Sequence, residues 1–278
     1  EQPQRITAGE AVARQAAGNW LVSRFDANTA LIPSAFVPGT PDAMGSAYAA
    51  TSLRLAGTGA GTAQAAVSAL STMVDTAVKD TGGNDLPGNL ARLILAARSV
   101  GSDPRAFGGV DLVARLEATI QATGPDQGRF GVQDATYDGA FRQGLALAAL
   151  SVVTPTPASI DGTLSTINSK PAVAWLRSQQ CSDGSWMPYR SNLSTPCAFD
   201  PITFSGPDTN GTAMAQLGLH AVGSWAPLNP LGWLAQVRVA DGGWGYDGSS
   251  SASDPNSTAL VVSATRSLGL QPDANALS

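Results

Sequence analysis

One motif recurs along the chain and constrains its fold more than any other feature. An aspartate, a few small polar residues and an Ala/Leu-rich stretch together are typical of a helix start, because the aspartate caps free backbone N–H groups. The clearest copies are Asp208–Leu219 and Asp254–Leu260; others begin at Asp42 and Asp85, with a weaker copy at Asp138. The motif predicts a repeat protein of five helix–loop–helix units.

A second helix is expected before each of these starts, and five apolar stretches fit that expectation. They are residues 8–25, 63–78, 110–122, 171–180 and 228–239. This makes about ten helices, and no run of residues has the alternation of a strand.

The spacing of the repeats is irregular, and the extra residues fall in loops. Equivalent positions are Gly45, Gly88, Gly139, Gly211 and Ser257. A solenoid would show a tighter period, so we expect helix pairs arranged around a closed ring. The prediction is a single all-α domain over residues 1–270, an α/α toroid of about five helix pairs, with residues 271–278 as a tail or the start of a linker.

The composition excludes several classes of partner. Only 13% of the 278 residues are charged and the net charge is −5, without a Lys/Arg cluster. Such a chain is not expected to bind nucleic acid, which requires phosphate neutralisation. The chain contains no apolar run of about 18 residues, so the sequence predicts no membrane span.

The two cysteines, Cys181 and Cys197, flank a loop rich in Ser, Pro and Asn. They predict a disulfide and therefore an oxidising compartment, so we expect a secreted or cell-surface protein. Two free loop thiols are the alternative.

Two loops resemble a known repeat. Residues 175–186 and 233–246 each contain a glutamine followed by Gly-x-Trp, as in triterpene cyclases, and residues 128–131 are a degenerate copy. The chain therefore resembles the terpenoid cyclase/protein prenyltransferase superfamily, with its prenyltransferase and squalene oxidase repeats. The helix starts are also similar to those of cobalamin-carrier-like bacterial surface proteins. The resemblance implies an α/α toroid.

The glutamine and tryptophan of these loops are expected to join one unit to the next. A glutamine at a helix end can bond to loop backbone, and a tryptophan ring can pack on the neighbouring unit. We predict this structural role, with ligand contact as the alternative, for Gln179, Trp186, Gln236 and Trp244.

The resemblance gives no support to catalysis by the cyclase motif. It places the proton-donating acid of class II cyclases at Gly211 and Ser257, preceded by Asn210 and Asn256. Protonating an alkene or epoxide needs a neutral carboxylic acid, which both copies lack. We predict no catalytic, metal or cofactor-binding residue and no cofactor. A cyclase-like enzyme with a displaced acid, at Asp138 or Asp200, is the alternative.

The helix starts have two interpretations. Their polar residues are either simple helix caps or a polar collar at the rim of a central cleft, able to bind a polyhydroxylated or amide-rich ligand. The leading hypothesis is a non-catalytic module that binds a small molecule or a protein partner; a corrinoid carrier is a further alternative. The candidate rim residues are Asp42, Asp85, Asp138, Asp208, Asn210, Asp254 and Asn256.

Overall fold

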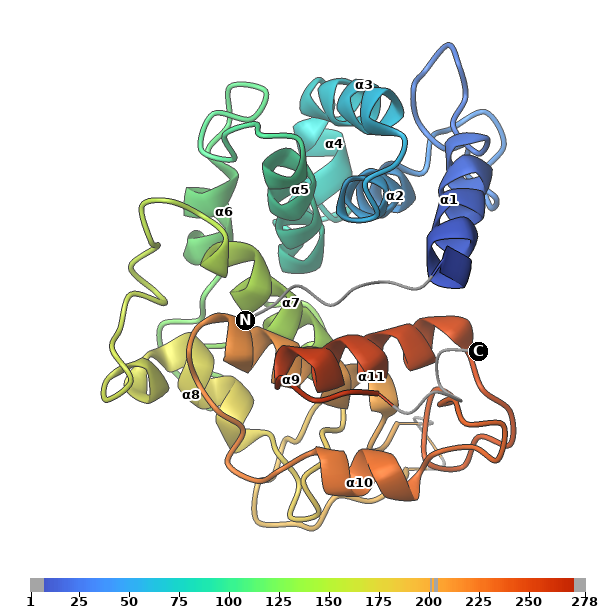
Figure 1. Cartoon of the computed structure of the whole chain (residues 1–278). Coiled ribbons are helices and arrows are strands. Elements are labelled where there is room, and N and C mark those ends of the chain that lie inside the picture. Colours follow the sequence, from blue (N-terminus) through green and yellow to red (C-terminus); the bar gives the residue numbers. More distant parts are fainter. Residues whose placement is uncertain (1–7, 201, 203–204, 273–278) are drawn as a thin grey trace. The chain divides into compact units, whose positions relative to one another are not determined.

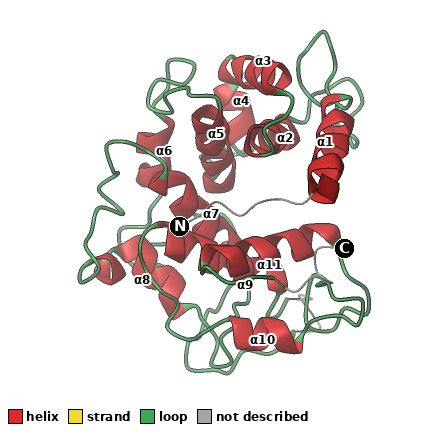
Figure 2. Cartoon of the chain, in the orientation of Figure 1, coloured by secondary structure: helices red, strands yellow, loops and turns green. Residues whose placement is uncertain are grey.

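The computed structural model describes residues 8–200, 202 and 205–272. Across these residues the chain is made of helices and loops, without a strand (Figure 2). This confirms the all-α class. The chain divides into two compact units, residues 1–115 and 116–278. The single domain over residues 1–270 stays a prediction, and residues 273–278 of the predicted tail lie outside the described residues.

The first unit is built around α2, which packs against both α3 and α5. Leu53, Leu70, Leu90 and Ile94 from these helices are almost fully buried and form its core. The helices of this unit, blue to green in Figure 1, are α1 (Ala8–Val22), α2 (Ala43–Leu55), α3 (Ala60–Ser71), α4 (Val74–Val78) and α5 (Pro87–Ser99), with α6 (Leu112–Ala118) crossing the boundary between the units.

Helix α1 does not bury the apolar side that its sequence suggests. Val12 is 70% exposed and Trp20 is 61% exposed, and Gly18 is the buried residue of this helix. A β-carbon on Gly18 would overlap the side chain of Thr58. The helix therefore approaches its neighbour through its backbone.

The helix predicted over residues 63–78 is two helices, α3 and α4. Near the break, the hydroxyls of Ser71 and Thr72 donate to the carbonyl oxygens of Ser68 and Ala69, each at 2.7 Å. Side chains that bond to the last turn compete with continuation of the helix. The predicted helices at 110–122 and 228–239 are likewise shorter, as α6 and α10.

The second unit is organised around α9, which packs against α7 and α11. Gly144 and Gly218 lie where α7 and α9 meet: a β-carbon on Gly218 would overlap the Gly144 backbone, and one on Gly144 would overlap the Met214 backbone. The helices of this unit, green to red in Figure 1, are α7 (Gly139–Ser151), α8 (Pro171–Ser178), α9 (Thr209–Ala221), α10 (Leu231–Gln236) and α11 (Pro255–Ser267), with a 3-10 turn at Ile167–Ser169.

The two Gly-x-Trp loops have the same hydrogen bonds. The Trp186 backbone N–H donates to Thr212 Oγ1 at 2.9 Å, and its indole Nε1 donates to the Leu176 carbonyl oxygen at 2.8 Å. Trp244 repeats both contacts, with Thr258 Oγ1 at 2.9 Å and the Leu234 carbonyl oxygen at 2.7 Å. Each tryptophan thus ties the helix before its loop to the helix after it.

Related contacts recur at other helix starts. The Ile32 N–H donates to Ser46 Oγ at 2.8 Å in the first unit, and the Phe130 N–H donates to Gln143 Oε1 at 2.9 Å in the second. In each case a polar side chain in the second turn of the helix accepts a hydrogen bond from the preceding loop.

Candidate functional site

Three of the five predicted helix starts are side-chain caps. The Oδ1 atom of the aspartate accepts the backbone N–H three residues ahead in each case. The distances are 2.8 Å for Asp42 and Gly45, 2.6 Å for Asp208 and Gly211, and 2.8 Å for Asp254 and Ser257. Local sequence alone accounts for this contact.

The other two aspartates have different partners. Asp85 lies two residues before α5 and forms an ion pair with Arg115, whose Nε donates to Asp85 Oδ2 at 2.9 Å. Asp138 precedes α7 without a side-chain cap bond, and its Oδ1 lies 3.6 Å from an Arg142 guanidinium nitrogen. An arginine takes the place of the backbone donor in both.

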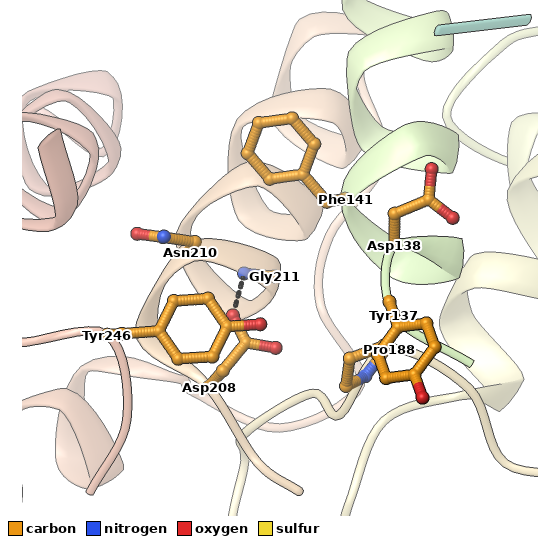
Figure 3. Close-up of a pocket in the computed structure, with 8 residues that line it drawn as sticks. All are labelled: Tyr137, Asp138, Phe141, Pro188, Asp208, Asn210, Gly211 and Tyr246. Atoms are coloured by element: carbon orange, nitrogen blue, oxygen red, sulfur yellow. Dashed lines mark hydrogen bonds between the residues drawn. The ribbon is translucent and has the colours of Figure 1, made fainter. Parts of the chain in front are cut away.

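A pocket of about 140 Å³ opens beside the N-termini of α7 and α9 in the second unit. In the view of Figure 3, Asp208, Asn210 and Tyr246 lie on one side, Asp138, Tyr137 and Pro188 lie on the other, and Phe141 lies above them. The pocket is lined by Tyr137, Asp138, Phe141, Pro188, Asp208, Asn210, Gly211 and Tyr246.

Backbone hydrogen bonds place the loops that form its walls. The Ala140 N–H donates to the Pro188 carbonyl oxygen at 2.7 Å, which fixes the Gly-x-Trp loop against α7. Gly139 makes this approach possible, because a β-carbon there would lie 2.6 Å from the same oxygen. The Thr209 N–H donates to the Tyr246 carbonyl oxygen at 2.9 Å and holds the second loop against α9.

Asp208 is the most unusual titratable group of the pocket. It is only 3% exposed. Burial raises its pKa to about 7, partly offset by hydrogen bonds from the Gly211 and Asn210 N–H groups, and the negative charge of Asp247 raises the pKa further. A carboxylic acid with such a pKa is substantially protonated near neutral pH.

Tyr246 and Asn210 complete this side of the pocket. Burial raises the pKa of Tyr246 to about 12, and the charges of Asp208 and Asp247 act in the same direction. The phenol therefore stays protonated. Asn210 Oδ1 is buried and accepts no hydrogen bond from the described residues.

The pocket contains three of the seven predicted rim residues, namely Asp138, Asp208 and Asn210. Asp254 caps α11 and Asn256 is exposed, while Asp42 and Asp85 belong to the first unit. The aromatic walls of the pocket were not predicted from the sequence; they are Tyr137, Phe141 and Tyr246. Their signal was present, since Tyr137 and Tyr246 each directly precede an aspartate.

The predicted glutamine contacts differ between the two loops. Gln179 Oε1 accepts the Arg190 N–H at 2.7 Å. The neighbouring Gln180, which was not predicted, donates to the Leu228 carbonyl oxygen and accepts the Leu228 N–H, both at 2.8 Å. Gln236 is exposed at the last position of α10.

Cys181 and Cys197 form a disulfide, as predicted. Inside the loop that it closes, the Arg190 guanidinium donates to the carbonyl oxygens of Gln180, Leu193 and Thr195 at 2.6, 2.8 and 2.9 Å. The loop is thus held both covalently and by its own arginine.

Comparison with known proteins assigns no family. No protein-family model matches the chain, and no curated protein is significantly similar to it. The resemblance to the terpenoid cyclase superfamily therefore rests on the Gln…Gly-x-Trp loops and stays a prediction.

Two further features concern the described residues only. These residues contain no group of three His, Cys, Asp or Glu side chains arranged to hold a metal ion. None of their helices has both the length and the apolar character that crossing a membrane requires.

Proposed function

We propose that the chain is a non-catalytic α-helical module that binds a small ligand in the pocket between the starts of α7 and α9. The observation that carries the proposal is the buried Asp208 carboxyl, which lines the pocket together with the aromatic rings of Tyr137, Phe141 and Tyr246 (Figure 3). A buried polar group that lacks part of its hydrogen bonds costs about 1–3 kcal/mol. A ligand that supplies N–H or O–H donors would recover part of that cost.

The size of the pocket limits what it encloses. Sites for drug-sized ligands occupy about 300–1,000 Å³, and a cavity of about 150 Å³ can hold benzene. At about 140 Å³, this pocket suits a small molecule or one end of a larger one. A corrinoid carrier would have to bind its much larger ligand at another surface.

We further propose that the helix pairs belong to an α/α toroid of the terpenoid cyclase type. The support is the shared contact between a loop N–H and the second turn of the next helix, made by Ser46 in the first unit and by Gln143, Thr212 and Thr258 in the second. The disulfide supports secretion or display at the cell surface.

A plugging variant tests the binding function. Asn210→Trp would fill the pocket, and Asn256→Trp is its matched control, because both are the second residue of their helices and Asn256 is exposed. Small polyols, amides and amines would be screened by ligand-observed NMR. The proposal expects binders that are lost with Asn210→Trp and kept with Asn256→Trp. Binders that are equally retained by both variants, or no binder at all, would contradict it.

A proton-donating enzyme is the second candidate, and one observation favours it. Asp208 combines burial and a pKa of about 7 with the aromatic neighbours Tyr137, Phe141 and Tyr246, whereas the displaced acids expected from the sequence were Asp138 and Asp200. Of these, Asp138 lines the pocket. A cyclised product from squalene or geranylgeranyl diphosphate, absent with Asp208→Asn, would establish the enzyme over the binding module.

A further inference from the structure

We propose that the ligand of the Asp208 pocket is a small organic ammonium ion with at least one N–H, held between the Asp208 carboxylate and the aromatic rings of the pocket. This inference rests on the proposed binding function and names its ligand class.

The lining has the chemistry of a cation site. Three aromatic rings contribute, from Tyr137, Phe141 and Tyr246, together with the carboxyl groups of Asp138 and Asp208. No lysine or arginine is among the lining residues. A cation over an aromatic face gains about 0.5–2 kcal/mol, most where water is excluded.

Helix N-termini ordinarily favour anions, but the donors of α9 are already used. The Thr209 N–H donates to the Tyr246 carbonyl oxygen, and the N–H groups of Asn210 and Gly211 bond to the Asp208 carboxyl. At α7 the Ala140 N–H is taken by the Pro188 carbonyl oxygen. An anion would therefore meet carboxyl groups without the backbone donors that normally hold it.

The Asp208 carboxylate decides between kinds of cation. A primary or secondary ammonium can donate an N–H to a carboxylate oxygen, and a quaternary ammonium cannot. The ammonium N–H would bond to the Asp208 carboxylate while the rest of the ligand contacts the aromatic rings shown in Figure 3.

The charges around Asp208 make such binding dependent on pH. Asp247 and Tyr246 face it from the loop after α10, and the α7 side contributes Asp138, which pairs with Arg142. With a pKa of about 7, Asp208 is roughly one-tenth ionised at pH 6 and roughly nine-tenths ionised at pH 8. An ammonium ion selects the ionised form, so binding releases a proton below pH 7, and the affinity rises about tenfold from pH 6 to pH 8.

The experiment compares n-butylammonium with 1-butanol, which has a similar chain and a hydroxyl donor but no charge. Dissociation constants would be measured by NMR titration at pH 6 and pH 8, where the amine stays protonated because its pKa is near that of lysine. We expect n-butylammonium to bind at least about tenfold more tightly than 1-butanol at pH 8. Only the amine should show the rise in affinity with pH.

Three variants make the test specific. Asp208→Asn keeps the capping oxygen and should remove both the preference for the amine and its pH dependence. Tyr246→Leu should weaken the amine several-fold and weaken 1-butanol less, because only the amine loses a cation–ring contact. Asp254→Asn, which changes the equivalent cap outside the pocket, should bind both probes as the wild type does.

The outcomes separate this inference from the function on which it rests. If 1-butanol binds as tightly as n-butylammonium and both are lost with Asn210→Trp, the ammonium proposal is overturned and the binding pocket stands. If n-butylammonium does not bind, the ammonium proposal is likewise overturned. If it binds but Asn210→Trp leaves its dissociation constant unchanged, both proposals are overturned.

Discussion

The Oδ1 atoms of Asp208 and Asp254 accept the same hydrogen bond, from the backbone N–H three residues ahead, at 2.6 and 2.8 Å. Their surroundings shift the pKa values of the two carboxyl groups in opposite directions. Burial raises the pKa of Asp208 to about 7, whereas the hydrogen bond from the Ser257 N–H lowers the pKa of Asp254. The same cap therefore contributes to stability with opposite dependence on pH.

Replacing Asp208 with asparagine should stabilise the protein relative to the wild type as the pH rises. In the folded state Asp208 holds its proton up to a pH of about 7, whereas an unperturbed aspartate has a pKa of 3.8. Between these values the folded state binds more protons, so wild-type stability falls with rising pH. Urea unfolding at pH 5 and pH 8 should show a relative gain for Asp208→Asn on the order of 2 kcal/mol.

Replacing Asp254 with asparagine should have the opposite profile. The lowered pKa of Asp254 means that its contribution is present above a pH of about 4 and is lost as the pH falls through the folded-state pKa. The side-chain oxygen of the introduced asparagine would still accept the capping bond, so only the charge–dipole part, about a few tenths of a kcal/mol, should disappear. If the unfolding free energies of the two variants depended on pH in the same way, burial would not be what sets the pKa values of these two caps apart.

The hydroxyl of Thr212 should matter more than its methyl group. Thr212→Val leaves the buried Trp186 N–H without its acceptor, which should cost about 1–3 kcal/mol of unfolding free energy. Thr212→Ser keeps the hydroxyl and is the matched control. Equal unfolding free energies for the two variants, measured in urea, would refute the assigned contact.

Any side chain at Gly218, where α9 packs closely against α7, should destabilise the protein. Gly218→Ala places a methyl group against the Gly144 backbone, and overpacking of this kind costs about 1–3 kcal/mol or more. Gly232→Ala in α10 is the control, since nothing lies within 4 Å of the added carbon. Thermal unfolding should show a loss for the first variant only; no loss at Gly218 would mean that the helices separate readily.

Reduction of the Cys181–Cys197 bond should destabilise the protein. The cysteines are 16 residues apart, and closing a loop of that length contributes about 3 kcal/mol in the chain-entropy model. Urea unfolding with and without reductant measures the difference. Thiol titration of the denatured, unreduced protein should detect no free thiol, and detection of two would contradict the disulfide.

Contacts between residues close along the chain could be predicted from the sequence. Asp42, Asp208 and Asp254 cap donors three residues away, and the disulfide joins the only two cysteines. The ion pair between Asp85 and Arg115 could not be predicted in this way, because the arginine lies 30 residues further along the chain.

The walls of the pocket depend on contacts that the sequence does not encode locally. Tyr246 reaches Asp208 because its carbonyl oxygen accepts hydrogen bonds from Thr209, 37 residues earlier in the chain. The burial that raises the pKa of Asp208 arises from this packing, whereas Asp254 has nearly the same local sequence and is more exposed.

The protonation state of Asp208 is the most direct test of the site. Carbon-13 NMR of labelled aspartate carboxyl groups, recorded from about pH 3 to about pH 9 on the wild type and on Asp208→Asn, would measure it. The structure predicts one carboxyl that titrates near pH 7, is missing in the variant, and shifts to lower pH when n-butylammonium is added. If every aspartate titrated below about pH 5, Asp208 would be an ordinary ionised cap, and the site described for this pocket would be wrong.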